Sequence, residues 1–245
     1  MKKAIFLLCI LSLFCGCGLS EDCIKSSGTV KTREVETLPF TKIFVYPGVN
    51  LVLSQGSEQS VTIQAGENFI ADVEVASDGE TLSLRDNSGC NWVRGYGETT
   101  VFVTAPDVIE IYSNTDRKIS SSGVLTYPIL RLFAMDIFDG IGTGDFHLEV
   151  DNQQLVIASN NISAFFIKGR TNEMLLNFYD DMGRFEGADF VSDSIKVFQR
   201  SSNDMIVHPV YKISGDIYST GDIISKTHPA DVQVIEHYTG RLIYD

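Results

Sequence analysis

The four histidines are the first residues to consider for metal or acid–base chemistry: His147, His208, His228 and His237. Zinc sites on a helix need histidines four residues apart, and many other zinc sites combine histidine with cysteine. None of the four histidines lies at a His-x-x-x-His spacing, and none stands beside a cysteine. The sequence therefore predicts no metal ligand among them, and His228 and His237 are interpreted as surface or turn residues.

Carboxylates offer a second kind of chemistry. Those of interest are Asp136, Asp139, Asp145 and the pairs Glu21-Asp22 and Asp180-Asp181. Gathered on one sheet, they could bind calcium through several oxygens, or serve a polysaccharide lyase or hydrolase as acid and base. A lyase would also need a basic neighbour, and the available residues are Lys168, Arg170, Arg184 and Arg200. Whether these groups meet depends on the fold.

Aromatic side chains crowd the second half of the chain. They are Phe133, Phe138, Phe165, Phe166, Phe178, Tyr179, Phe185, Phe190 and Phe198. Most fall at alternating strand positions or beside turns, so we expect them mainly as an inward-facing ladder in the core. Phe178 and Tyr179 are adjacent and must point to opposite faces of a strand, so at least one of them is expected to be exposed.

The single tryptophan, Trp92, lies in the glycine-rich stretch SGCNWVRGYG at 88–97, which also contains Tyr96. Loops of this kind commonly carry binding residues. Trp92 and Tyr96 are therefore our candidates for contact with a ligand. A tryptophan here could equally plug an open end of the fold, and that alternative stays open.

The elements that would position these groups are strands. Short runs with alternating apolar residues, such as KIFVY at 42–46, are bounded by Gly, Asn, Asp and Pro throughout, and no window carries a convincing helical period. From residue 107 onward the runs recur, with units beginning at Ile109, Leu130, Leu155, Leu175, Ile195, Tyr211 and Val232. The spacings are 21, 25, 20, 20, 16 and 21 residues.

This period is that of one coil of a solenoid. The sequence thus predicts an all-β protein, a right-handed single-stranded parallel β-helix over 107–245, preceded by a more irregular β portion to about residue 106. Its corners are expected at Asn114, Asp136, Asn160 and Asn161, Asp180 and Asp181, and Ser201, as a solvated column of turn residues. The doubled Gly-Asp-Ile of SGDIYSTGDI at 214–223 is interpreted as two corners of one shortened coil, with Gly215 and Gly221 in the turns.

The predicted coils decide against a carboxylate site. Asp136 and Asp181 would share a column two coils apart with Asn161 between them, which leaves roughly 9.6 Å between backbones. No column unites these acids with the basic residues. The sequence accordingly predicts no catalytic residue, no metal ligand and no cofactor.

The first residues are a targeting segment. Lys2 and Lys3 precede an apolar stretch, AIFLLCILSLF at 4–14, that is too short to span a bilayer, which is typical of a signal peptide at 1–16. Cys17 follows a small residue and resembles the acylated cysteine of a bacterial lipobox, although Leu13 lies one position further upstream than is usual. Residues 17–28 would then be a lipidated tether to a domain at 29–245. The alternative is ordinary secretion with cleavage near Ser20.

The run GLSED behind Cys17 resembles the export signal of Bacteroidota-type lipoproteins, which implies an outer-membrane lipoprotein exposed at the surface, with the periplasmic face as the alternative. In an oxidising compartment Cys23 and Cys90 could form a disulfide or remain free thiols. Without Lys2 and Lys3 the chain has 17 basic residues against 32 acidic ones. Such a charge disfavours nucleic acid and anionic lipid headgroups, so contact with the membrane is expected only through the lipid anchor.

Three stretches resemble the head GIN domain family, described as putative auto-transporter adhesins. They are VKTREVETLPFTKIFVYPGVNLVLSQG at 30–56, SVTIQAGENFIADVEVASDGETLSLRD at 60–86 and TVFVTAPDVIEIYSN at 100–114, and the closing TGRLIYD at 239–245 also fits. The glycine turns common in that family are replaced here by SNTD, SNNI, YDDM and RSSN. The resemblance implies a right-handed β-helix in a secreted or lipid-anchored protein, and it brings no catalytic residues.

These observations predict a non-enzymatic cell-surface lipoprotein that binds a glycan or another surface protein. One alternative is a polysaccharide lyase or hydrolase of the pectinase-like β-helix class. Another is a structural envelope protein with no soluble ligand, which would lack an exposed aromatic cleft.

Overall fold

The computed structural model describes residues 26–88, 99–136, 142–179 and 182–245. Its strands are β1 (Val30–Val35), β2 (Lys42–Val45), β3 (Val49–Gln55), β4 (Ser60–Gly66), β5 (Val73–Ser77), β6 (Thr81–Asp86), β7 (Thr99–Ala105), β8 (Glu110–Ser113), β9 (Ile119–Leu125), β10 (Ile129–Ala134), β11 (Phe146–Ser159), β12 (Ala164–Phe178), β13 (Arg184–Gln199), β14 (Met205–Ile217), β15 (Ile223–Ser225), β16 (Asp231–Glu236) and β17 (Leu242–Tyr244). None of the described segments is a helix able to cross a membrane.

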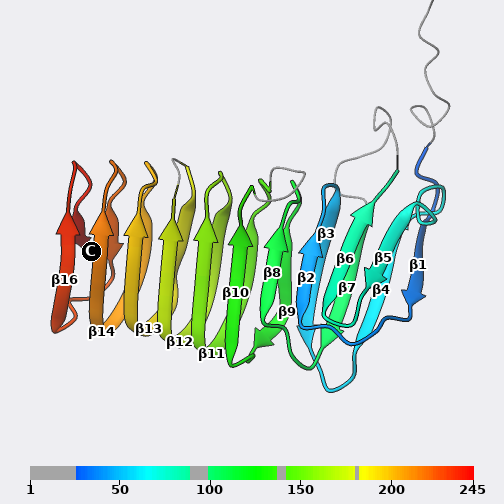
Figure 1. Cartoon of the computed structure of the whole chain (residues 1–245), viewed down its shortest axis with the longest axis horizontal. Coiled ribbons are helices and arrows are strands. Elements are labelled where there is room, and N and C mark those ends of the chain that lie inside the picture. The colour runs from blue at the N-terminus through cyan, green and yellow to red at the C-terminus, as the bar shows by residue number, and fades with distance from the viewer. Residues whose placement is uncertain (1–25, 89–98, 137–141, 180–181) are drawn as a thin grey trace, which may run out of the picture.

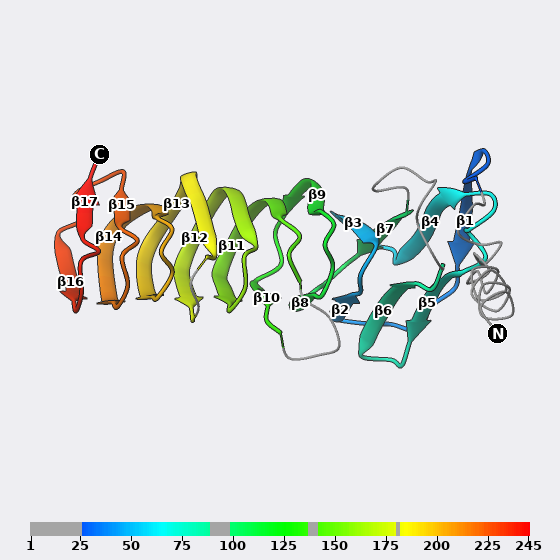
Figure 2. The same cartoon turned by 90° about the horizontal axis from the view of Figure 1, so that it is seen from above.

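The strands form a flattened solenoid of two facing sheets (Figures 1 and 2). The front sheet, nearer the viewer in Figure 1, contains β5, β6, β2, β8 and β10, the second halves of β11 to β14, and β16. The back sheet contains β1, β4, β7, β3 and β9, the first halves of β11 to β14, β15 and β17. The predicted all-β solenoid is confirmed.

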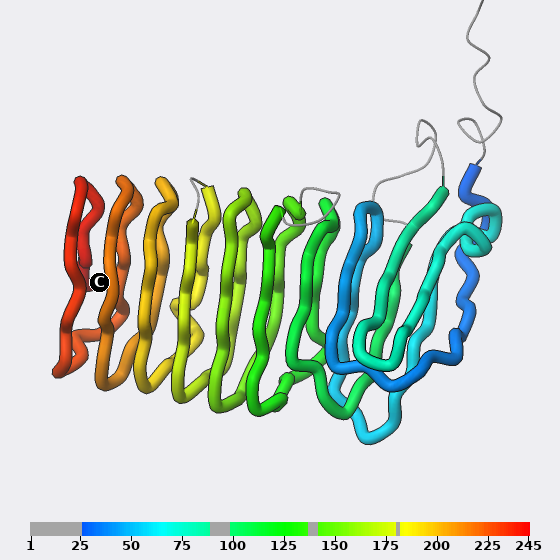
Figure 3. The backbone as a smooth tube through the Cα atoms, in the orientation of Figure 1, coloured from blue at the N-terminus to red at the C-terminus, as the bar shows by residue number. Residues whose placement is uncertain are grey.

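The coil has the predicted hand. From β8 to β16 the front strands run upward in Figure 1 while the chain advances from right to left, which defines a right-handed path. Every pair of strands in this part is parallel. The tube in Figure 3 shows the resulting stack of flattened loops, each with an upper and a lower corner.

The core lies between the sheets and is made of columns of equivalent residues. On the front sheet one column joins Ile111, Leu132, Ile157, Leu176 and Val197 across neighbouring strands, and each is at most 2% exposed. On the back sheet the matching column is Phe146, Phe165, Phe185, Met205 and Ile223, all fully buried. Alternation along each strand places these apolar side chains inside, and their burial drives the coil to close.

The lower corners share one hydrogen bond that recurs from coil to coil. In each of four coils a buried polar side chain donates to the carbonyl two residues further on: Asn152 to Gln154 (2.9 Å), Thr171 to Glu173 (3.2 Å), Ser192 to Ser194 (2.9 Å) and Ser225 to Thr227 (2.7 Å). Such local bonds turn the backbone out of the strand direction. The sequence analysis did not predict this second corner ladder.

The upper corners contain the turn residues that the sequence predicted, but those residues are buried. Asn114, Asn161 and Ser201 are 3%, 7% and 0% exposed, so the expected solvated column is wrong at these positions. The neighbouring coils on either side cover each corner. A polar group that is buried in this way needs a hydrogen-bond partner inside the protein. Ser201, for example, donates to the Gly183 carbonyl at 2.6 Å and accepts from the Asn203 amide at 3.1 Å.

The N-terminal portion is more irregular, as predicted. Here β1 pairs with β4, β4 with β7 and β5 with β6, all antiparallel. The coil formed by β2 and β3 is also out of chain order, because β2 lies between β6 and β8, and β3 lies between β7 and β9. The first parallel coil of the chain is therefore the second in space.

Two predicted coil registers are wrong. Leu155 is opposite Met174 and not Leu175, and Ile213, not Tyr211, is opposite Ile195. A shift of one residue moves a side chain to the other face of a sheet, so Met174 is buried and Leu175 faces outward.

The doubled Gly-Asp-Ile is also only partly as predicted. Ile217 and Ile223 are fully buried, but Gly215 lies inside β14 and is not at a corner. A Cβ on Gly215 would lie 1.9 Å from the Val197 carbonyl oxygen. The glycine therefore allows two strands to approach closely.

Candidate binding face

The outward side of the front sheet carries three groups of side chains that could meet a partner. The alternation that sends one set of residues into the core sends the other set to this surface. Along the sheet these residues form a charged ladder, a stack of aromatic rings and a second, more exposed row of rings.

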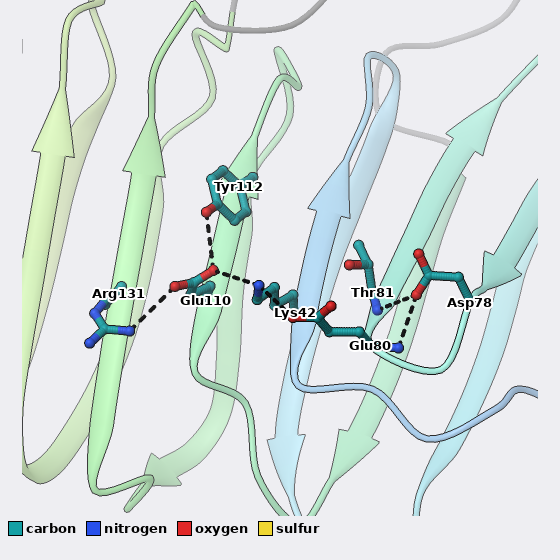
Figure 4. Close-up of polar contacts among 7 residues, drawn as sticks. All are labelled: Lys42, Asp78, Glu80, Thr81, Glu110, Tyr112 and Arg131. Carbon is teal, nitrogen blue, oxygen red and sulfur yellow. Dashed lines mark hydrogen bonds and ion pairs between the residues drawn. The ribbon is translucent and has the colours of Figure 1, made fainter.

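The charged ladder crosses β2, β8 and β10 (Figure 4). The Glu110 carboxylate lies 3.6 Å from Lys42 Nζ and 3.3 Å from Arg131 Nη1, and it accepts a hydrogen bond of 3.0 Å from the Tyr112 hydroxyl. Lys42 also contacts Glu80 at 2.7 Å. Its hydrogen bond to Glu80 and the charge of Glu110 raise the pKa of Lys42. All the charges in this ladder have partners, so it serves to hold the strands in register.

The surroundings also shift the pKa of Tyr112 in the ladder and of Asp78 beside it. Burial, followed by the bond to Glu110, raises the pKa of Tyr112. Asp78, in the turn before β6, accepts the Thr81 and Glu80 amides at 2.8 and 2.9 Å, which lowers its pKa. Neither environment is that of a catalytic acid or base, because the bonds are local and structural.

The first set of rings, the N-terminal stack, consists of Phe44, Tyr112 and Phe133. Their centroids are 4.2 and 4.6 Å apart and their planes lie within 17° of each other. Rings stacked in this way use their faces on one another and leave mostly their edges to the solvent. The N-terminal stack therefore stabilises the pairing of β2, β8 and β10.

The second set, the C-terminal row, consists of Tyr179, Phe198, Tyr218 and His237. Tyr179 and Tyr218 are 43% and 44% exposed. The planes of Tyr179 and Phe198 differ by 44°, and those of Phe198 and Tyr218 by 49°, so these rings do not cover one another face to face. Neither tyrosine hydroxyl has a hydrogen-bond partner within the described part of the chain. At its end Tyr218 stacks on His237 at 4.1 Å, and His237 Nε2 is 2.7 Å from Asp216.

A shallow hollow of about 210 Å³ lies beneath the C-terminal row on the same sheet. The side chains at its rim are Glu173, Leu175, Ser194, Lys196, Lys212 and Ser214. Lys212 pairs with Asp231 at 3.0 Å, whereas Lys196 is exposed and has no ion pair within the described residues. Small serines make the depression, and the lysine and the hydroxyls give it hydrogen-bonding capacity.

Of the carboxylates considered in the sequence, the structure describes Asp136 and Asp145. Asp145 accepts the Ala164 amide at 3.1 Å, and the Asp136 amide donates to Asn160 at 2.9 Å, so both act in turns. Among the residues that the structure describes, no cluster of three or more His, Cys, Asp or Glu could hold a metal ion. Glu21, Asp22, Asp139, Asp180 and Asp181 lie outside the described residues.

The aromatic predictions were right for some residues and wrong for others. Phe165, Phe178, Phe185 and Phe190 are buried as expected, and Tyr179 is the exposed member of its pair with Phe178. Phe133, Phe166 and Phe198 face outward and do not belong to a core ladder. Phe138 lies outside the described residues.

Several predicted site residues cannot be placed. Cys17, Cys23, Cys90, Trp92 and Tyr96 all lie outside the described residues. Their roles as lipid attachment site, disulfide partners and ligand contacts stay predictions. The C-terminal row was not predicted as a surface from the sequence, since Tyr218 was not among the candidate residues and Phe198 was expected in the core.

Comparisons with known proteins agree with this architecture. A sequence model of the family described as "putative auto-transporter adhesin, head GIN domain" matches residues 39–229. A solved structure of a putative adhesin from Bacteroides fragilis shares 17% identity, covers 90% of this chain and 100% of its own, and gives a TM-score of 0.78. A putative adhesin from Parabacteroides distasonis shares 12% identity with a TM-score of 0.63, covering 90% of this chain and 99% of its own.

A third solved structure, titled a putative lipid binding protein from Parabacteroides distasonis, shares 12% identity and gives a TM-score of 0.60, covering 89% of this chain and 100% of its own. A search of curated proteins gave no match. At these identities the solved structures establish the fold alone.

The fold defines a class of protein, the β-solenoid, whose stacked coils form long flat faces. The family match covers most of this solenoid. The chain belongs to the head GIN domain family of putative auto-transporter adhesins.

Proposed function

We propose that this protein is a non-enzymatic binding module of the cell envelope whose front sheet recognises a glycan on a partner surface. The observation that carries the proposal is the C-terminal row, in which Tyr179, Phe198 and Tyr218 are tilted and partly exposed. Ring faces of this kind give apolar contact to the carbon side of a sugar, and their hydroxyls give it hydrogen bonds. Family membership supports a role in adhesion.

The hollow beneath the row adds the polar half of such a site. Ser194, Ser214 and Lys196 can hydrogen-bond to sugar hydroxyls while the rings above contact apolar atoms. An apolar platform beside a few convergent polar groups is the usual arrangement of a small-ligand site. We further propose that the protein is anchored through Cys17 and displayed on the outer membrane, as its first 28 residues predict.

A glycan array and whole-cell binding with the purified full chain test this proposal. We expect saturable glycan binding that falls at least tenfold in Tyr218→Ala and in Tyr179→Ala. Tyr211→Ala is the matched control, because Tyr211 is 66% exposed but lies at the lower corner, away from the row. Trp92→Ala tests the loop contact predicted from the sequence.

Two results would contradict the proposal. If the chain binds a surface protein through the same tyrosines and binds no glycan, the ligand is a protein and the glycan proposal is wrong. Formation of double bonds in a polyuronate, read as ultraviolet absorbance, would show a lyase. Mass spectrometry of the mature N-terminus tests Cys17 separately.

A further inference from the structure

A second concave surface lies at the lower corner of the solenoid. The C-terminal row lies near the upper corner, at the ends of β12 to β14. The second surface is a groove of about 490 Å³ whose lining spans β9, β11, β12, β13 and β14. Because it crosses five neighbouring strands, it runs along the solenoid axis for about 19 Å, at about 4.8 Å per strand. All of its lining residues are in the described part of the chain.

The lining of the groove contains one backbone irregularity. Gly169 has φ +105°, and the pairing of β12 with β13 changes register between Phe166 and Gly169. A Cβ at Gly169 would lie 2.2 Å from the Val150 carbonyl oxygen, so this position can carry no side chain without moving the neighbouring strand. Gly169 therefore lets β11 and β12 approach closely in the middle of the lining.

The apolar part of the lining is made of valines and one tyrosine. Val124 and Val210 are 43% and 37% exposed, and Tyr211 is 66% exposed at the end of the groove. Val191 is half-buried between them, whereas the side chain of Val150 is fully buried beneath the lining. Several large apolar side chains that gather in a concave site mark a place where another molecule can bury them.

The charged part of the lining is acidic. Glu149, Asp151 and Asp193 face the groove together with one cation, Arg170, which leaves a net charge of two negative units among these four groups. Arg170 approaches Asp193 only to 4.0 Å. The Glu149 and Asp151 carboxylates are exposed and have no ion-pair partner within the described residues.

We propose that this groove binds an extended peptide in which lysine or arginine alternates with apolar side chains. The aliphatic stems of such cations can lie on the valines while their charged ends reach Glu149 and Asp151. Tyr211 adds a ring face for a cation at the end of the groove. At about 3.3 Å per residue, a six-residue extended peptide spans the length of the groove.

Charge complementarity selects this ligand class over others. An anionic glycan or a phosphate would meet the acidic rim unfavourably, and the formal charge of −13 for the whole chain would oppose its approach. A neutral oligosaccharide would form no ion pair with Glu149 or Asp151, although Lys168 and Arg170 lie opposite them on β12. This proposal concerns a different surface from the front-sheet proposal and does not depend on it.

The test uses the purified full chain and a fluorescent six-residue peptide that alternates lysine and valine, with its termini blocked. Fluorescence anisotropy should show saturable binding that weakens at least tenfold between low and high salt. The double variant Glu149→Gln with Asp151→Asn should weaken binding at least tenfold, and Tyr211→Ala should weaken it severalfold. A glutamate–valine peptide should not bind, and a lysine–serine peptide should bind more weakly.

The matched control is Glu34→Gln with Glu36→Gln, which removes two acidic charges from the opposite end of the solenoid, beside β1. It should leave the affinity for the peptide unchanged. An equal loss in both double variants would overturn the proposal, because it would mean attraction to net charge alone. Binding of neutral oligosaccharides that requires Tyr211, with no binding of the lysine–valine peptide, would also overturn it. Tyr218→Ala should leave peptide binding intact, so failure of the front-sheet proposal can be told from failure of this one.

Discussion

Gly169 and Val150 sit directly opposite each other on β12 and β11, and a Cβ on the glycine would lie 2.2 Å from the valine carbonyl oxygen. The backbone of Gly169 is also in the left-handed region, at φ +105°. The close pairing of these two strands thus depends on a glycine at position 169. We expect Gly169→Ala to lower the free energy of unfolding by about 3 kcal/mol, since strain of about 1–2 kcal/mol is joined by displacement of a paired carbonyl. Thermal or urea unfolding measures this loss.

Gly123→Ala provides the control for that experiment. Gly123 has φ +88°, but a Cβ there would meet nothing within 4 Å. This variant should lose only the strain, about 1 kcal/mol. Equal losses in the two variants would show that the approach of Val150 adds nothing.

The lower-corner ladder predicts a second stability effect. Thr171 is fully buried, and its hydroxyl donates to the Glu173 carbonyl at 3.2 Å. Thr171→Val keeps the shape of the side chain and removes the bond, so we expect a loss of about 1 kcal/mol in chemical unfolding. The same substitution at the exposed Thr32 of β1 should change stability by less than about 0.5 kcal/mol. A neutral result at Thr171 would mean that the corner does not depend on this bond.

The coil period could be predicted because inward aliphatic residues recur at the same point of each unit. Leu132 illustrates this, since the polar residue Arg131 directly before it fixes its phase. The run Met174-Leu175-Leu176 gives no such phase, because all three residues are apolar, so an apolar side chain faces the core whether Leu175 points inward or outward. The pairing of β2 with β6 and β8 had no local signal at all, since it joins segments far apart in the sequence.

The same uncertainty about which residues face inward explains why two rings of the candidate binding face were expected in the core. Phe133 and Phe198 were expected in the core because they belong to a set of aromatic residues that mostly fall at alternating strand positions or beside turns. Their neighbours held the contrary signal, since Leu132 and Val197 are both inward and each phenylalanine follows one of them directly. Adjacent residues of a strand face opposite ways, so a reading of phase before hydrophobicity would have placed both rings on the surface.

The charged ladder predicts a coupled change in stability and in a pKa. Glu110→Gln removes the charge that Lys42 and Arg131 share, at 3.6 and 3.3 Å, and should cost about 1 kcal/mol after allowance for the partial exposure of both cations. The same variant should lower the pKa of Tyr112, because its bond to Glu110 and the charge of Glu110 raise that pKa after burial does. Carbon NMR of the tyrosine ring follows the titration. The exposed Glu58→Gln is the control, and a Tyr112 pKa that stays in place would assign the whole shift to burial.

His147 predicts how stability depends on pH. Its ring stacks on Phe166 with centroids 4.6 Å apart, and burial together with the charge of Lys118 lowers its pKa, against a smaller opposing effect of Asp145. The unfolded chain, with a histidine pKa of about 6.5, therefore binds a proton more readily than the folded chain does. Because stability rises with pH wherever the unfolded state holds more protons, this group should stabilise the fold fully above about pH 7 and progressively less as the pH falls toward the folded pKa.

His147→Phe keeps a ring against Phe166 but cannot titrate. As the pH falls from 7.5 to 5, the melting temperature of this variant should therefore rise relative to that of the original chain. Lys118→Gln should reduce the same pH dependence, since Lys118 is one of its two causes. Parallel melting curves for the original chain and His147→Phe across this range would show that protonation of His147 does not affect folding.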